Sequence, residues 1–282
     1  MQSSQDNWQN SWQAPAKINL FLHVVGRRND GFHLLQTVFR FIDYCDWLRF
    51  EPRTDARIVL ADPIPGVPPE TDLTVRAAKA LQIATGTTAG ATIHLDKRLP
   101  MGGGLGGGSS DAATTLIALN RLWNSGLDSP ALQRLGLALG ADVPVFIHGR
   151  TTFAEGIGEQ FTNVNAPAES YLVLIPPVAV PTPVIFRSDK LQRNTPAISP
   201  ADWRAGFGHN DLEPVACSLY GEVAECLTWL RGFGDARMSG SGACCFVGFA
   251  DRKDAESALA ACPPNFRGFV AQGLDTHPLH RD

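Results

Sequence analysis

The sequence predicts an α+β fold of two lobes, and three observations lead to this prediction. Strand-like and helix-like segments are mixed along the chain without the regular alternation that a parallel α/β sheet requires. From about residue 150 onward, strands and proline-rich connections dominate, which places a boundary near residues 150–156. The length of 282 residues fits one large domain or two of ordinary size.

Composition and charge exclude several classes of function. The net charge of −4 comes without a block of like charges, so the chain offers no general attraction to nucleic acid or to anionic membranes. Its first sixteen residues carry one charge and no apolar run, unlike a secretory signal. The six cysteines form no CxxC pair and no zinc-site spacing. We therefore expect a soluble cytoplasmic protein without nucleic-acid or membrane partners, as a monomer or weak homodimer.

The first elements follow from polarity and alternation. Residues 1–13 are polar and aperiodic and are predicted to be a loose tail. A strand is expected over residues 14–25, where alternation puts Lys17, Asn19, Phe21 and His23 on one face. Turn residues occupy 26–31, and 34–50 has the pattern of a strand region leading into a second strand.

A glycine-rich segment lies between a strand and a helix. Residues 72–84 have the pattern of an amphipathic helix, and 91–95 that of a strand. Residues 100–110, PMGGGLGGGSS, then lead into a predicted helix over 111–123. Its candidate N-caps are Ser109, Ser110 and Asp111.

The remaining elements are less regular. A helix is expected over about 130–139, and residues 140–149, GADVPVFIHG, are predicted to form a turn into a short buried strand. One long amphipathic helix is predicted over 212–231, with Asn210 and Asp211 as its N-terminal cap.

The glycine-rich segment predicts a phosphate site. Consecutive glycines allow close approach of the backbone and positive φ, and the following helix offers free N–H groups at its positive end. A flexible surface loop is the alternative, and it is disfavoured because the glycines directly precede a helix. The candidate nucleotide-binding residues are Pro100, Met101, Gly102, Gly103, Gly104, Leu105, Gly106, Gly107, Gly108, Ser109 and Ser110.

Two better-known glycine motifs do not fit this segment. A P-loop ends in GK[ST], whereas here Gly108 precedes Ser109 without a lysine. The dinucleotide pattern GxGxxG is matched formally by Gly102, Gly104 and Gly107. Its acidic partner would be Asp128, which lies in a loop-like stretch.

The same segment resembles the phosphate loop of the GHMP small-molecule kinases, a pattern of proline, glycines, serines and two alanines. Three more segments agree in order, AKINLFLHVVGRRNDGFH at 16–33, GADVPVFIHG at 140–149 and ARMSGSGACCF at 236–246. The likeness spans about residues 14–273. The extended form GGGLGGGSSDAA resembles the branch of that superfamily acting on 4-diphosphocytidyl-2-C-methyl-D-erythritol in the non-mevalonate isoprenoid route.

This resemblance implies a fold and an activity. The fold would be the two-lobed GHMP kinase fold, with an ATP-binding, ribosomal S5 domain 2-like lobe over 14–155 and a ferredoxin-like lobe over 156–282. The activity would be transfer of phosphate from ATP, with Mg²⁺, to the 2-hydroxyl of a small molecule carrying a cytidine diphosphate group. The sequence identifies no protein ligand for the metal.

Lys17 and Asp142 are the candidate catalytic pair. By residue type alone, a strand lysine is most often solvated, and Asp142 is as readily a turn cap as a base. The resemblance implies that Asp142 accepts the proton of the attacking hydroxyl and that Lys17 stabilises the charges beside it.

The resemblance also implies a base-binding site. Two aromatic rings would enclose the cytosine, and a histidine would bond its polar edge. Phe32 stands where the family commonly has tyrosine, so a hydroxyl is lost; by residue type alone it could be a core side chain. The candidate substrate residues are Asn19, Phe32, His33, Thr182, Phe186, Ser239 and Gly240.

Three alternative functions remain at this stage. Another GHMP kinase, for homoserine, mevalonate or a sugar, would share the glycine loop but would not need a cytidine group. A nucleotide-binding sensor without catalysis would not require both Lys17 and Asp142. A hydride-transferring enzyme would bind a nicotinamide cofactor.

Overall fold

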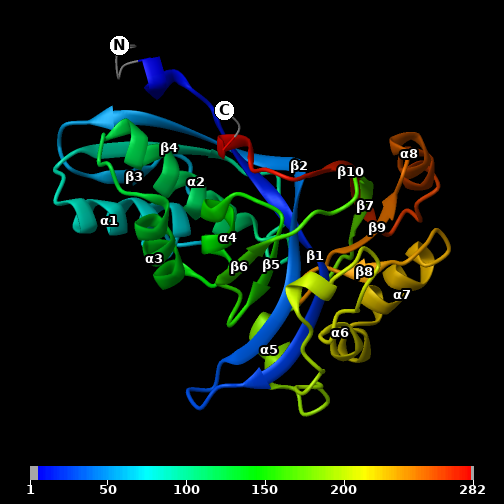
Figure 1. The fold of residues 1–282 in the computed structure, drawn as a ribbon. Helices are drawn as coiled ribbons and strands as arrows, with labels where there is room; N and C mark the ends of the chain where they lie inside the picture. The colour runs from blue at the N-terminus through cyan, green and yellow to red at the C-terminus, as the bar shows by residue number, and fades with distance from the viewer. Residues whose placement is uncertain (1–5, 281–282) are drawn as a thin grey trace.

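A strand of 21 residues, β2 (His33–Arg53), runs through the centre of the computed structural model, which describes residues 6–280 (Figure 1). Four strands pair with it antiparallel, namely β1 (Trp12–Arg27), β4 (Gly90–Asp96), β5 (Thr152–Glu155) and β10 (Arg267–Leu274). One central strand therefore organises most of the amino-terminal half of the sheet.

The sheet continues into the carboxy-terminal half through β10. This strand pairs with β2 at Gly273 and Leu274 and with β7 along the rest of its length. The remaining strands are β3 (Ile58–Leu60), β6 (Gln160–Asn163), β7 (Ser170–Ile175), β8 (Arg237–Met238) and β9 (Cys245–Phe249). The order is β3-β4-β2-β10-β7-β9-β8, with β1 and β5 paired to β2 and β6 paired to β5.

Each lobe has its own helices and its own apolar core. In the amino-terminal lobe these are α1 (Leu73–Thr85), α2 (Gly107–Leu122), α3 (Ser129–Leu139) and α4 (Val143–His148). In the carboxy-terminal lobe they are α5 (Thr182–Arg187), α6 (Glu213–Leu219), α7 (Gly221–Leu230) and α8 (Arg252–Ala260). The first core joins α1, α2 and α4 to β2 and β4, and the second joins α6 and α7 to β7 and β9.

The two-lobed α+β architecture predicted from the sequence is confirmed (Figure 1). The predicted domain boundary at residues 155 and 156 falls between β5 and β6. These two strands pair with each other as a hairpin, and the hairpin belongs to the amino-terminal lobe because β5 also pairs with β2. Within residues 6–280, no helix has the length and apolar character needed to cross a membrane.

The prediction of a buried strand within residues 140–149 is wrong, because this segment forms α4. Five consecutive residues, Val143–Ile147, are buried, and a short apolar run of this kind does not distinguish a strand from a buried helix. Pro144 lies in the first turn of the helix, where its missing N–H costs nothing.

The single long helix predicted over 212–231 is also wrong. The chain leaves the helical conformation at Tyr220 (φ −131°, ψ 99°), which separates α6 from α7. Apolar spacing continues across the break because both helices face the same core, so periodicity alone could not reveal it.

The amino-terminal predictions need two corrections. Residues 6–9 form a 3-10 helix and β1 begins at Trp12, whose side chain is buried, so residues 6–13 are not a loose tail; residues 1–5 lie outside the described part. The region 34–50 is one continuous strand and not two.

Candidate active site

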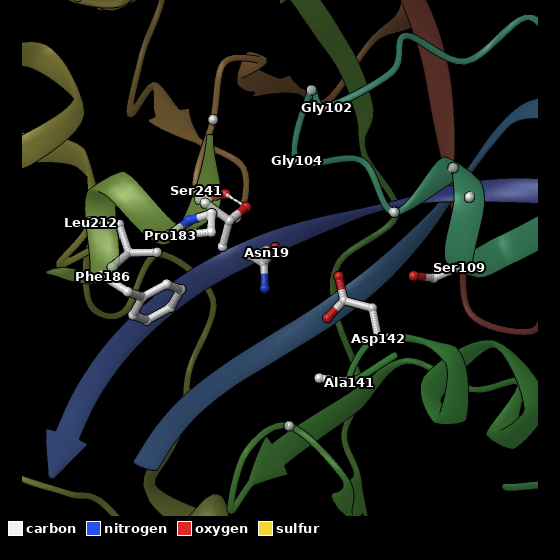
Figure 2. A pocket seen from close by; sticks show the side chains of 18 of the residues that line it. Asn19, Gly102, Gly104, Ser109, Ala141, Asp142, Pro183, Phe186, Leu212 and Ser241 are labelled. Atoms are coloured by element: carbon white, nitrogen blue, oxygen red, sulfur yellow. Dashed lines mark hydrogen bonds between the residues drawn. The ribbon is translucent and has the colours of Figure 1, made fainter. Parts of the chain in front are cut away.

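A cavity of about 1230 Å³ lies between the two lobes and collects most of the predicted site residues. Figure 2 shows side chains from β1, α5 and the start of α2 converging on it. Three predicted residues do not line it, namely Leu105, Ser110 and Ser239, and all three are buried beneath the loops that do.

The glycine-rich segment forms one edge of the cavity with its backbone. Gly102, Gly104 and Gly106 all have positive φ, between 66° and 76°, a conformation that favours glycine. At Gly104 a Cβ would stand 2.0 Å from the Ser239 carbonyl oxygen, so no other residue fits there without displacing the backbone. The conformation of the glycine-rich segment is thus set by its close approach to the backbone of Ser239.

The helix that follows begins four residues earlier than predicted. α2 starts at Gly107 with Gly106 as N-cap and no capping side chain, so none of the three predicted N-caps serves that role. The Ser110 hydroxyl instead donates to the Pro15 carbonyl oxygen at 2.7 Å, which fixes the helix to β1. The first N–H groups of α2 therefore face the cavity edge without side-chain caps, as an anion site requires.

Lys17 and Asp142 come together across the cavity floor. Lys17 Nζ lies 3.3 Å from Asp142 Oδ2 and donates to Asn19 Oδ1 at 2.7 Å. The lysine is only 2% exposed, whereas the aspartate side chain is 38% exposed and open to a ligand. A buried ammonium thus faces a carboxylate that a substrate hydroxyl can reach.

Backbone contacts hold Lys17 in place. Its N–H donates to the Leu105 carbonyl oxygen at 2.9 Å, which ties β1 directly to the glycine-rich segment. Its ammonium lies 5.3 Å from the centre of the Phe39 ring, a cation–π contact. Asn19 is held in turn by donating to Thr37 Oγ1 at 2.9 Å.

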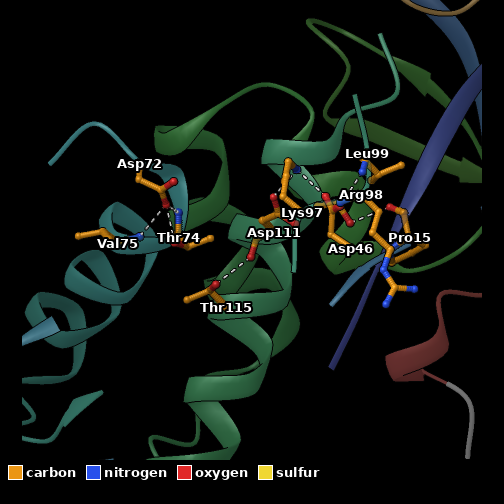
Figure 3. Close-up of polar contacts among 11 residues, drawn as sticks. Pro15, Asp46, Asp72, Thr74, Val75, Lys97, Arg98, Leu99, Asp111 and Thr115 are labelled. Carbon is orange, nitrogen blue, oxygen red and sulfur yellow. Dashed lines mark hydrogen bonds and ion pairs between the residues drawn. The ribbon is translucent and has the colours of Figure 1, made fainter. Parts of the chain in front are cut away.

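A buried ionic cluster at the start of α2 was not predicted (Figure 3). Lys97 Nζ contacts Asp46 Oδ2 and lies 2.7 Å from Asp111 Oδ2. Burial raises the pKa of Asp111 to about 8 in spite of Lys97. Burial alone would lower the pKa of Lys97, but the two carboxylates together outweigh burial and raise the pKa. The only sequence signal was the position of Asp111 directly after the two serines.

A second glycine turn, residues 238–242, docks onto the first. The Ser239 hydroxyl donates to the Gly104 carbonyl oxygen at 2.9 Å, and the Cys244 N–H donates to Gly103 O at 3.0 Å. Asn210 holds this turn by donating to the carbonyl oxygens of Met238 and Gly240 at 2.7 and 2.8 Å. Asn210 was predicted only as a helix cap, yet α6 has Leu212 as its N-cap.

The far end of the cavity holds the predicted base-binding residues. Phe32 is 57% exposed, so it is not a core side chain. The ring centres of His33 and Phe186 are 4.9 Å apart with an angle of 34° between the planes. Thr182 Oγ1 lies 2.6 Å from Ser241 Oγ, which joins α5 to the second glycine turn.

Arg193 is a further residue of this end that the sequence analysis missed. It lines the cavity and donates from Nε to His33 Nε2 at 3.1 Å. Burial, followed by the charges of Arg193 and Arg27, lowers the pKa of His33.

The cavity brings few side-chain donors together for a metal ion. Within residues 6–280, no group of three or more His, Cys, Asp or Glu side chains is arranged to hold a metal ion. Ser109 and Asp142 direct their side-chain oxygens into the same part of the cavity (Figure 2). The Ser109 hydroxyl oxygen fits a Mg²⁺ that keeps its waters and takes its other ligands from bound phosphates.

Comparison with known proteins gives two family matches. The model described as GHMP kinases N terminal domain matches residues 72–150, and the model described as GHMP kinases C terminal matches residues 198–267.

Similar curated proteins cover nearly the whole chain. A protein of Dechloromonas aromatica (strain RCB), named 4-diphosphocytidyl-2-C-methyl-D-erythritol kinase, is 63% identical over 269 residues, 95% of this chain and 98% of its own length. A protein of the same name from Thiobacillus denitrificans (strain ATCC 25259 / T1) is 59% identical, covering 96% of this chain and 97% of its own.

Solved structures agree with these relatives. A crystal structure of 4-(cytidine 5'-diphospho)-2C-methyl-D-erythritol kinase matches with a TM-score of 0.82 and 34% identity, covering 94% of this chain and 99% of the other. A crystal structure of mevalonate kinase matches with a TM-score of 0.66 at 12% identity, covering 95% of this chain and 100% of the other, a likeness of fold alone.

Proposed function

The chain belongs to the GHMP kinases, in the branch of the 4-diphosphocytidyl-2-C-methyl-D-erythritol kinases, and we propose that it transfers the γ-phosphoryl group of ATP to the 2-hydroxyl of 4-diphosphocytidyl-2-C-methyl-D-erythritol. The products are the 2-phosphate and ADP. It is an ATP-dependent small-molecule kinase, and the alternatives of a sensor or a hydride-transferring enzyme are not favoured.

The observation that carries the proposal is the Lys17–Asp142 pair, which lies between the phosphate loop and the base-binding end. In this proposal, ATP phosphates lie along residues 100–110, and the cytosine lies between Phe32 and Phe186 with His33 at its edge. The space between the ATP phosphates and the cytosine is lined or supported by Asn19, Thr182, Ser239 and Gly240. The acceptor hydroxyl then meets Asp142.

Asp142 acts as the base in this mechanism. Its exposed carboxylate accepts the proton as the hydroxyl oxygen bonds to the γ-phosphorus and the bond to the β,γ-bridging oxygen breaks. The Lys17 ammonium, held by Asn19, remains beside the developing negative charge and stabilises it. The N–H groups at the start of α2 bind the phosphate oxygens.

Mg²⁺, when bound with ATP, would neutralise charge on the β- and γ-phosphates. Ser109 is the side chain that would contribute an oxygen to it, with water and phosphate oxygens as its other ligands, while the Asp142 carboxylate stays free to act as the base. Asp142 also contributes its negative charge to the Lys17 pair.

The test is ADP release with ATP, Mg²⁺ and the cytidylylated methylerythritol in the wild type and in Asp142→Asn. We expect turnover in the wild type and a fall of kcat by about 10²-fold or more in the variant, since general base catalysis typically contributes that much. ATP binding, measured by titration, should persist. Asp254→Asn, an exposed position on α8 outside the cavity, is the matched control and should keep full turnover.

Two results would contradict the proposal. Turnover on homoserine or mevalonate instead would keep the kinase chemistry and remove the substrate assignment. ATP binding without turnover on any acceptor would favour a sensor.

A further inference from the structure

Arg193 connects the two walls of the base-binding end. Its Nη2 donates to the carbonyl oxygens of Phe186 and Ser188 at 2.9 and 2.7 Å, and its Nη1 donates to Leu191 O at 3.0 Å. Its Nε donates to His33 Nε2 at 3.1 Å. One half-buried guanidinium thus ties the first residue of β2 to the carboxy-terminal end of α5, two elements that lie far apart in the chain.

The contact with His33 determines where the imidazole carries its proton. A guanidinium has five N–H donors, no acceptor, and stays charged in proteins. His33 Nε2 must therefore accept, and the neutral ring then has its proton on Nδ1. A doubly protonated ring would turn an N–H toward the guanidinium, so the charge of Arg193 favours the neutral form.

The bonds to α5 fix the second wall. The last carbonyl groups of a helix have no partner within it, and Arg193 satisfies those of Phe186 and the C-cap residue Ser188. The Phe186 ring packs against the His33 ring with centres 4.9 Å apart. Both ring positions therefore depend on the same side chain.

We propose that Arg193 is a positioning residue for the pyrimidine base, which fixes His33 as the Nδ1–H tautomer and holds Phe186 beside it. This inference rests on the proposed function, since the base is the cytosine of that substrate. The Nδ1–H group is a donor, and it matches the acceptors O2 and N3 on the cytosine edge. Arg193 acts through His33 and Phe186 and needs no contact with the substrate.

The first test is the tautomer of His33 by ¹⁵N NMR of the histidine-labelled protein, with His33 identified by its missing signals in His33→Asn. In the wild type we expect a protonated Nδ1 and an unprotonated Nε2. In Arg193→Met, which keeps length and removes every donor, a substantial Nε2–H population should appear. A wild-type ring protonated on Nε2 would overturn the proposal without any variant.

The second test is binding of cytidine 5'-diphosphate by calorimetry, together with steady-state kinetics. In Arg193→Met we expect about tenfold weaker binding and about tenfold higher KM for the cytidylylated substrate, the size expected for loss of one well-placed hydrogen bond. The kcat and the KM for ATP should stay within about twofold. Arg193→Lys keeps the charge but not the planar fork of donors. Its affinity and its KM should lie between those of the wild type and those of Arg193→Met.

Arg204→Met is the matched control. Arg204 lies in the same connection and donates to the carbonyl oxygens of Ala201 and Trp203, but it does not line the cavity. The Arg204→Met variant should leave both the tautomer of His33 and the binding of cytidine 5'-diphosphate unchanged. Equal effects of the two variants, or unchanged binding in Arg193→Met, would overturn the proposal. Absence of turnover in the wild type would refute the proposed function and would leave the tautomer and binding tests valid.

Discussion

At the scale of single residues, the cluster of Lys97, Asp46 and Asp111 contains two carboxylates and one ammonium, a formal charge of −1 beside the glycine-rich segment (Figure 3). Asp46 Oδ1 accepts the N–H groups of Arg98 and Leu99, whereas Asp111 Oδ1 has no hydrogen-bond partner within residues 6–280. Asp111 is thus the less stabilised anion, in keeping with the rise of its pKa to about 8 on burial. Its proton would remove one negative charge next to the glycine-rich segment, where the proposed function places the ATP phosphates.

Asp111→Asn should change how stability depends on pH. Between the ordinary pKa of 3.8 and about 8, folded Asp111 holds a proton that the unfolded chain lacks, so the contribution of Asp111 to stability falls as pH rises. The slope for one proton is up to about 1.4 kcal/mol per pH unit. The variant should lack this contribution in urea unfolding at pH 6, 7 and 8. Asp96→Asn, at an exposed ion pair with Arg98, should keep the wild-type slope; equal slopes in all three proteins would refute the prediction.

At the scale of elements, the packing of α3 on α4 determines where Asp142 lies. A Cβ at Gly136 would stand 2.8 Å from Val143 Cγ1 and 2.9 Å from Ile147 Cδ1. Because α4 begins directly after Asp142, its position against α3 sets the distance from Asp142 to Lys17.

Gly136→Ala should therefore destabilise the protein although alanine is the better helix former. Overpacking costs about 1–3 kcal/mol, and the gain in helix propensity offsets up to about 1 kcal/mol of it. We expect a lower Tm and a kcat reduced by at least about tenfold, since a small displacement of a catalytic group is costly. Arg134→Ala, exposed on the same helix, should change neither. A Gly136→Ala protein as stable and active as the wild type would show that α4 adjusts freely.

How well the sequence predicts these elements depends on whether the pattern is local or joins residues far apart in the chain. The glycine-rich segment was predicted because its signal is local, a run of glycines before a helix. The strand expected in place of α4 was wrong because periodicity does not distinguish short buried runs. Neither the Lys97–Asp46 contact nor the Arg193–His33 contact has a local pattern, since each joins residues brought together only by the fold.

At the scale of the whole molecule, the two lobes meet where the two glycine turns dock. Gly104 belongs to the amino-terminal lobe and contacts Ser239 of the carboxy-terminal lobe so closely that a side chain has no space. Folding of the glycine-rich segment and assembly of the lobes therefore depend on each other.

Gly104→Ala should weaken lobe assembly far more than Gly102→Ala. Both glycines have positive φ, so both alanines cost about 1 kcal/mol in backbone strain. Only at Gly104 would the new Cβ overlap the Ser239 carbonyl, whereas at Gly102 nothing lies within 4 Å. We expect thermal unfolding of Gly104→Ala at least about 3 °C below that of Gly102→Ala, since about 2 kcal/mol shifts Tm by that much in a chain of this size. Equal Tm values would mean that the turns dock loosely.

The pairing of β10 with β2 limits how the lobes can move. A hinge needs a thin connection, but here β10 of one lobe continues the sheet of the other. The second half of β1 also bonds the carboxy-terminal lobe, from the Leu22 N–H to His209 O and from the Thr195 N–H to Val24 O. Rotation of one lobe against the other would break these bonds together. The opening between the lobes is therefore present, with Lys17 and Asp142 already side by side, before anything binds in it.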